Sequence, residues 1–228
     1  MLNNRYKIRS IFWILLIVTS FLFGVGLAAF EPSDEVKKLS IIVFLCFVAI
    51  SSTIINLLWY RAFNQKLASL QPILLEQHDA DRYIAEINDL MDEQKSLQIR
   101  SILQLSLSAA YCEKKDFRKA KEMLSLINPK KLNAVNRTLY WADYTYIHFY
   151  LKENNKAIHI MNEQNAAFNK ISKLPKWGAL FLILTIFKEL AEGNLTKAQS
   201  LLEQERPKWE TEHNTDDFEY LEKLCQEK

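Results

Sequence analysis

The sequence predicts an all-α protein in two parts: a two-helix membrane anchor at residues 1–64 and an α-solenoid of paired helices at residues 65–228. Three observations favour this fold class. Only four glycines and five prolines occur among 228 residues, and Leu, Ala, Lys and Glu are abundant, which favours helix. Two long stretches near the start carry no charged residue. No alternating β pattern and no Asn-Gly hairpin signal is present.

The two uncharged stretches are residues 10–30 and 39–60, with helices expected at about 10–30 and 39–61. A helix rises ~1.5 Å per residue, so each stretch is long enough to cross a hydrocarbon core of ~30 Å. The connector EPSDEVKK is short, which predicts an antiparallel hairpin. The sequence therefore predicts a multi-pass protein of the cell (plasma) membrane with two spans.

Basic residues indicate the orientation of the hairpin, because cytoplasmic flanks carry an excess of Lys and Arg. The outer flanks hold Arg5, Lys7, Arg9, Arg61 and Lys66, and the connector holds Lys37 and Lys38. This distribution predicts that the N- and C-termini are both cytoplasmic. The alternative is a cleaved signal peptide, with RYKIR as its basic region and GLAAF as its cleavage site. The first apolar stretch is longer than the ~7–15 residues typical of a signal peptide, which favours a span.

Small and hydroxyl residues occur within both apolar stretches: Ser20, Gly24, Gly26, Ser51, Ser52, Thr53 and Asn56. They can serve a transport path or a partner-binding face, or they can let the two helices pack closely. No Asp, Glu, Lys, Arg or His lies inside either stretch, which argues against ion translocation by this chain alone. Hairpin packing is the favoured interpretation.

A helix pair is predicted at residues 104–127. Its packing residues are Leu107, Ser108, Tyr111, Phe117, Ala120 and Leu124. Lys114, Lys115 and Asp116 form the turn, and the Asp116 carboxylate can cap the second helix. Small residues at 108 and 120 allow two antiparallel helices to approach closely.

This spacing resembles the tetratricopeptide repeat, with Gln104 and Ser108 at that repeat's usual tryptophan and glycine positions. Weaker matches follow at Trp141, Tyr144 and Ala157, and at Leu182, Ala198 and Leu202. The alanines stand 37 and 41 residues apart, against ~34 in the usual repeat. Pro129, Pro175 and Pro207 are each expected just after a helix. Residues 67–91 predict a further pair and look like membrane-anchored repeat proteins of Gram-positive bacteria.

The resemblance implies a concave inner face formed by the first helix of each pair. Its residues would be Leu105, Ala109, Cys112, Ala142, Tyr146, Phe149, Leu180, Ile183 and Phe187. This apolar and aromatic surface suits an amphipathic helix or an apolar peptide from a protein partner. The alternative is that the chain's own last helix, at about 214–227, fills the groove and caps the domain. The latter interpretation is slightly favoured, because soluble surfaces rarely expose large apolar patches.

The charge of the solenoid is unevenly distributed. Residues 95–176 carry 15 basic and 6 acidic side chains, whereas the flanking blocks 61–94 and 177–228 are acidic. The basic block can face anionic lipid or an acidic partner, or it can be a solvated convex face, which is favoured. Nucleic acid is not expected as a partner, because no recognition pattern is present.

The sequence offers no pattern of catalytic, cofactor-binding or metal-binding residues. His78, His148, His159 and His213 match no metal-ligand spacing, and no phosphate-binding or nucleophile-elbow motif occurs. We expect His148 to be a core residue and Cys112 to be a core or groove residue. The three cysteines suggest no disulfide framework. The prediction is therefore no enzyme, no cofactor and no metal.

These observations favour a membrane-anchored scaffold or adaptor that displays a cytoplasmic repeat domain to a protein or peptide partner. Three alternatives stay open. The first is an accessory subunit of a membrane transporter or secretion complex that acts through the hairpin. The second is an enzyme with an unrecognised site, which would show a polar cleft with perturbed titratable groups. The third is a peptide-responsive regulator, although the DNA-binding domain of such regulators is missing here.

Overall fold

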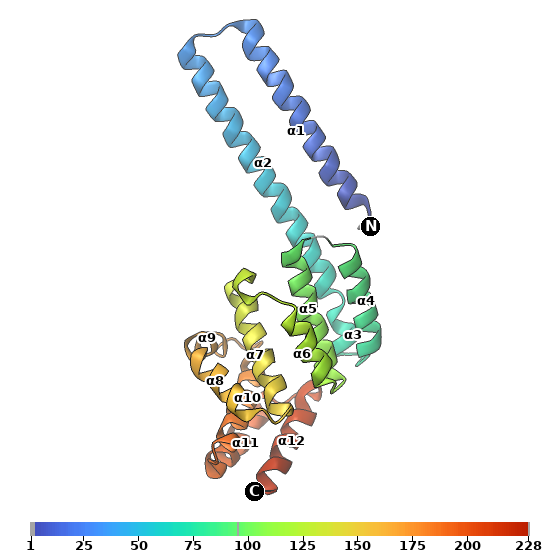
Figure 1. Ribbon diagram of the computed structural model, residues 1–228, viewed down its shortest axis with the longest axis vertical. Coiled ribbons are helices and arrows are strands. Elements are labelled where there is room, and N and C mark those ends of the chain that lie inside the picture. Colours follow the sequence, from blue (N-terminus) through green and yellow to red (C-terminus); the bar gives the residue numbers. More distant parts are fainter. Residues whose placement is uncertain (1–2, 95, 228) are drawn as a thin grey trace. The chain divides into compact units, whose positions relative to one another are not determined.

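The computed structural model describes residues 3–94 and 96–227, and it divides the chain into two compact units, Met1–Leu70 and Gln71–Lys228. The described residues form helices and no strands (Figure 1), so the all-α prediction is confirmed. The first unit contains α1 (Asn3–Phe30) and α2 (Asp34–Ala68). The second contains α3 (Gln71–Leu75), α4 (Ala80–Asp92), α5 (Leu97–Glu113), α6 (Phe117–Ser125), α7 (Ala134–Tyr150), α8 (Asn154–Glu163), α9 (Asn165–Ile171), α10 (Gly178–Ala191), α11 (Leu195–Trp209) and α12 (Thr215–Gln226).

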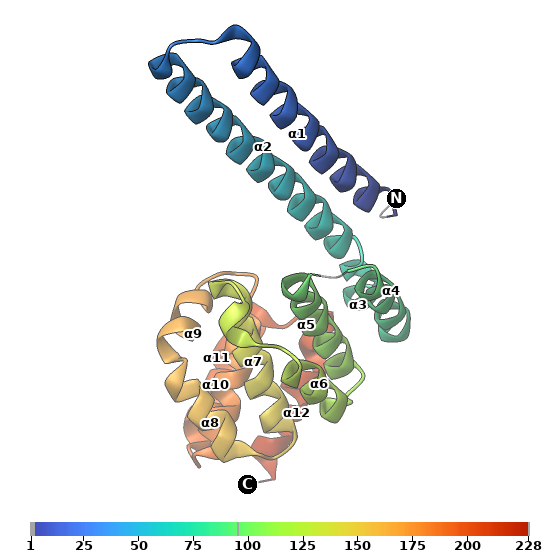
Figure 2. The same cartoon turned by 45° about the horizontal axis from the view of Figure 1, so that its top comes forward.

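Helices α1 and α2 run side by side in opposite directions (Figures 1 and 2). Both are long and apolar enough to cross a membrane, and their apolar windows are not buried by protein. The rings of Phe23 and Phe44 stack across the hairpin, with 4.3 Å between their centroids. The expected close packing through small residues is wrong for the glycines, because no neighbouring atom lies within 4 Å of a Cβ placed on Gly24 or Gly26. The hydroxyl of Ser20 donates to the Leu16 carbonyl of its own helix.

Helix α2 is longer than the sequence predicts. It begins at Asp34 and continues to Ala68, whereas the expected helix covers only about 39–61. Asp34 and Glu35 lie in its first turn, where negative side chains stabilise the positive end of the helix dipole. No proline or glycine follows Tyr60 before Ala68, so nothing ends the helix where the apolar stretch ends.

The second unit consists largely of consecutive helices that pack in pairs: α3 with α4, α5 with α6, α7 with α8, and α10 with α11. The first helices of successive pairs also contact one another, since α7 packs against both α5 and α10. Helix α9 is not predicted by the sequence. It packs against α7 and α8 and buries Phe168 and Ile171.

Four turns between paired helices contain a residue in the left-handed region: His78 (φ 51°), Lys115 (φ 59°), Lys152 (φ 61°) and Gly193 (φ 84°). They are separated by 37, 37 and 41 residues. At the last three turns the same backbone hydrogen bond recurs. The N–H of Asp116, Glu153 and Asn194 each donates to the carbonyl five residues earlier, at 2.9, 2.8 and 2.8 Å. This is the Schellman arrangement, which satisfies the carbonyls at a helix end.

The alanines singled out in the sequence lie where two paired helices are closest. Ala120, Ala157 and Ala198 have no exposed surface. In the first of these pairs, the buried Ser108 hydroxyl donates to the Ala120 carbonyl across the helix interface at 3.1 Å. Among the other predicted packing residues, Leu107, Leu124 and Leu202 are buried, whereas Tyr111, Phe117, Trp141, Tyr144 and Leu182 are half-buried.

Two prolines and one glycine lie at or between the ends of helices in the second unit. Pro129 starts a short 3₁₀ turn, and Pro175 lies in the turn between α9 and α10. The prediction that Pro207 follows a helix is wrong, because it lies inside α11. A Cβ at Gly178, the first residue of α10, would lie only 2.2 Å from the Trp209 ring at the end of α11. This glycine therefore allows the indole ring to lie directly on the backbone.

We predict that Gly193→Ala lowers the free energy of unfolding of the second unit by about 1–2 kcal/mol, because alanine is strained at positive φ. Thermal unfolding of the full chain in detergent, followed by far-ultraviolet circular dichroism, measures the change. Gly24→Ala is the matched control. It also adds a methyl group into open space, but at a helical position, so it should not lower the midpoint. An unchanged midpoint for Gly193→Ala contradicts the assigned turn geometry.

Candidate functional site

The residues predicted to form the inner face differ in exposure. Ala142, Phe149, Ile183 and Phe187 are buried; Leu105, Cys112, Tyr146 and Leu180 are half-buried; and Ala109 is exposed. All four buried residues belong to the largest hydrophobic cluster of the second unit. The ring of Phe149 stacks on that of Phe187 at 5.1 Å, which joins α7 to α10.

Helix α12 supplies the same hydrophobic cluster with three buried side chains, those of Phe218, Leu221 and Cys225. The helix packs against α10 and α11. Its predicted range of 214–227 agrees closely with the observed Thr215–Gln226. The apolar part of the inner face is therefore covered by the chain's own last helix.

Polar contacts attach the start of α12 to α7. The hydroxyl groups of Tyr146 and Tyr150 both donate to Oδ1 of Asp217, the former at 2.7 Å. Tyr146 and Tyr150 stand one helical turn apart on α7, so both hydroxyls reach one carboxylate. Hydrogen bonds to a charged acceptor are stronger than neutral ones. Asp217 therefore fixes the register of α12 along α7.

Two lysines whose backbone lies in the left-handed region, one in each of two turns, also contact α12. Lys115 forms an ion pair with Asp216, with 3.5 Å between Nζ and Oδ2. The ammonium of Lys152 donates to the Tyr220 hydroxyl and lies 5.1 Å from the centre of that ring. The backbone conformation that reverses the chain thus also directs two cations toward the last helix.

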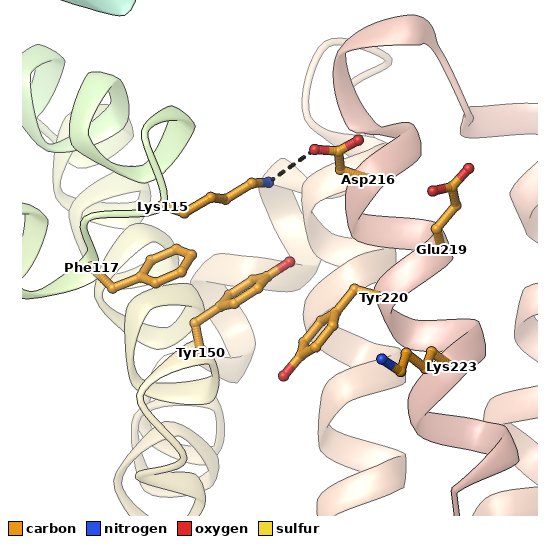
Figure 3. Close-up of a pocket in the computed structure, with 7 residues that line it drawn as sticks. All are labelled: Lys115, Phe117, Tyr150, Asp216, Glu219, Tyr220 and Lys223. Atoms are coloured by element: carbon orange, nitrogen blue, oxygen red, sulfur yellow. Dashed lines mark ion pairs between the residues drawn. The ribbon is translucent and has the colours of Figure 1, made fainter.

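A shallow, largely open depression of about 430 Å³ lies between α6, the end of α7 and α12 (Figure 3). Three rings from these helices form a stack along it. The ring of Tyr150 stacks on Phe117 at 4.3 Å and on Tyr220 at 5.1 Å. The charged side chains around the rings are Lys115, Asp216, Glu219 and Lys223. We call these seven residues the aromatic cavity. Its apolar walls and mixed charged rim suit a side chain of a protein partner.

Burial raises the pKa of several groups beneath α12. It raises the pKa of Asp143 to about 7, and it raises the pKa of the Cys112 thiol well above its usual value, with the Asp143 carboxylate acting in the same direction. The pKa of Tyr146 is also raised by burial and then by Asp217. These shifts keep Cys112 and Tyr146 protonated. A thiol held in this form is a poor nucleophile, so the arrangement does not activate Cys112.

His148 is a buried core residue that is satisfied by a hydrogen bond, as the sequence predicts. Its Nδ1 lies 2.7 Å from Oε2 of Glu153, and burial lowers its pKa. Glu153 also accepts hydrogen bonds from Lys156 at 2.9 Å and Lys121 at 3.0 Å. These cations lower the pKa of Glu153 to about 2. The Glu153 carboxylate, in the turn between α7 and α8, therefore links α6, α7 and α8 through side-chain hydrogen bonds.

Sequence reasoning did not predict the polar contacts of α12 or the aromatic cavity. The pattern that could have indicated them is the pair Asp216–Asp217 at the start of an amphipathic helix, opposite two tyrosines spaced four residues apart. The side chain of His159 is 72% exposed. No family model, curated protein or solved structure matches the chain.

We predict that Asp217→Ala lowers the free energy of unfolding of the second unit by about 2 kcal/mol, because two tyrosine hydroxyls lose a charged acceptor. Asp216→Ala is the matched control. Asp216 lies in the same helical turn and its side chain is 75% exposed, so its loss should cost less than about 1 kcal/mol. Chemical denaturation of both variants measures the difference. Equal effects would show that the tyrosine bonds do not hold α12.

We predict that Asp143→Asn stabilises the second unit above about pH 7 and leaves it unchanged near pH 4. Burial raises the pKa of Asp143 from 3.8 to about 7, so between these values the folded chain binds a proton that the unfolded chain releases. The wild-type free energy of unfolding therefore falls through this interval as the pH rises.

Denaturation across this pH range, expressed as the difference between variant and wild type, tests the effect. Asp92→Asn removes an exposed carboxylate of α4 and should give a flat difference. A flat difference for Asp143→Asn would contradict the burial of its carboxylate.

Proposed function

We propose that the chain is a membrane-anchored adaptor. The hairpin of α1 and α2 spans the cell membrane with both termini in the cytoplasm, and the helix pairs form a tetratricopeptide-like repeat domain that holds a protein partner. The length and apolar composition of α1 and α2 support the anchor. The 37-residue recurrence of left-handed turns and the fully buried alanines support the repeat interpretation.

The observation that carries the proposal is the aromatic cavity. Helix α12 packs in the same hydrophobic cluster as the buried residues of the predicted inner face, whereas the stack of Phe117, Tyr150 and Tyr220 borders an open space of about 430 Å³. Aromatic side chains contribute much of the binding energy at protein interfaces. We infer that an apolar anchor side chain of the partner inserts beside this stack, with the charged rim fixing its orientation.

The chemistry beneath α12 favours binding over catalysis. The Cys112 thiol is not an activated nucleophile, since burial raises its pKa. Tyr146 and Tyr150, whose pKa values are raised by burial, act as hydrogen-bond donors to Asp217 of α12. These features fit a static scaffold better than an enzyme with an unrecognised site.

We predict that a photo-crosslinking amino acid at Tyr220 captures a discrete protein in intact membranes, and that the same group at His159 on α8 does not. Tyr220 lines the cavity, whereas His159 is exposed elsewhere on the domain. Phe117→Ala should weaken the capture at least tenfold, because it removes one ring of the stack. Equal capture from both positions, or capture unaffected by Phe117→Ala, would contradict the proposed site.

Replacing α1 and α2 by an unrelated two-helix anchor distinguishes the adaptor from an accessory subunit of a transporter or secretion complex. An adaptor keeps the Tyr220 crosslink after the exchange, because its contacts lie in residues 71–228. A subunit that acts through the hairpin loses it. No residue in the apolar window of either helix is buried by protein, which is the feature that keeps this second function in consideration.

A further inference from the structure

Three side chains that are distant in sequence converge at one surface position of the second unit. His78 lies in the turn between α3 and α4, Glu113 is the last residue of α5, and His213 lies in the 3₁₀ turn Glu212–Asn214 that precedes α12. Nδ1 of His78 is 3.3 Å from Oε1 of Glu113, and Nδ1 of His213 is 3.8 Å from Oε2. The three ligand atoms all lie within 4.8 Å of one another.

The backbone holds each of these side chains in a defined position. His78 is in the left-handed region, and the following residue, Asp79, caps α4 by accepting from the N–H of Arg82 at 2.9 Å. The turn containing His213 is closed by a capping box between Thr211 and Asn214. The buried side chain of Asn214 also donates to the Trp209 carbonyl at 3.0 Å. The convergence therefore does not depend on flexible segments.

The charges around Glu113 leave its carboxylate open to a cation. The neighbouring Lys114 pairs with Asp81, and Lys115 pairs with Asp216. Only the two imidazole rings approach the Glu113 carboxylate within ion-pair distance among the described residues. The rings of His78 and His213 lie nearly parallel, with centroids 6.3 Å apart and an interplanar angle of 28°, and both direct Nδ1 to the same carboxylate.

We propose that His78, Glu113 and His213 bind a zinc ion. Two imidazole nitrogens and one carboxylate oxygen are a ligand set that Zn²⁺ accepts, at about 2.0–2.2 Å from the metal, with a fourth position left to water. Tetrahedral ligands at this distance lie about 3.4 Å apart. The 3.3 Å and 3.8 Å separations from Glu113 are close to this value, whereas the two imidazole nitrogens, which lie within 4.8 Å of each other, must approach by up to about 1.4 Å through side-chain rotation. All three residues are partly exposed, so the ion enters from solvent.

Zinc at this position joins three parts of the second unit: the first turn, the end of α5 and the segment that leads into α12. Because the 3₁₀ turn immediately precedes Asp216 and Asp217, the ion holds the start of α12 where its contacts with Lys115 and the tyrosines form. This role goes beyond the adaptor proposal and does not depend on the identity of any partner.

We predict that the full chain, purified in detergent without a polyhistidine tag and stripped with a chelator, binds one Zn²⁺ in competition with a chromogenic chelator. His78→Ala and His213→Ala should each weaken binding roughly tenfold or more, as should Glu113→Gln, because each removes a direct ligand. Added Zn²⁺ should raise the thermal midpoint of the wild type but not that of His213→Ala.

His159→Ala is the matched control, since His159 also lies 3.3 Å from a glutamate, Glu163, but has no second imidazole beside it. Cys46→Ala tests binding by the exposed cysteine. Both controls should bind Zn²⁺ within about twofold of the wild type. Absence of a one-to-one site in the wild type overturns the proposal, and so does unchanged affinity in folded His213→Ala and Glu113→Gln.

Discussion

The second unit depends on a backbone constraint at the turns between paired helices. At each of them one residue takes a left-handed conformation, and in the last three the same pair of bonds closes the end of the preceding helix. Because the reversal is sharp, the following helix returns along its partner, and only a small residue fits at the crossing. Ala120, Ala157 and Ala198 occupy that crossing without exposed surface. The left-handed turn therefore requires a small residue, here alanine, in the helix that follows it.

The same turns explain how the last helix is held. An apolar helix face slides easily along another apolar surface, since hydrophobic contact is non-directional. Lys115 and Lys152 project from successive turns toward α12, and Asp217 accepts from two tyrosines of α7. These polar contacts are directional, so they select one register among many that would bury Phe218 and Leu221. The inner face is therefore closed by a specific contact and not by collapse alone.

Local signals made the helices and their pairing predictable, whereas contacts between distant segments were not. The cap at Asp116 and the hydrogen bond of His148 to Glu153 depend on residues within a few positions of each other. The local sequence gives no strong signal for or against helix at α9 or in the part of α2 that continues to Ala68. The bonds of Asp217 and the convergence of His78 with His213 join segments far apart in the chain, so local spacing alone does not show that these residues meet.

The contact between Gly178 and Trp209 has a consequence for how this sequence can change over time. The indole occupies the space that any side chain at position 178 would need, so the two sites are not free to vary independently. In homologous chains, a larger residue at position 178 should accompany a smaller one at position 209. Such paired substitution would provide an evolutionary record that α10 and α11 cross at this point.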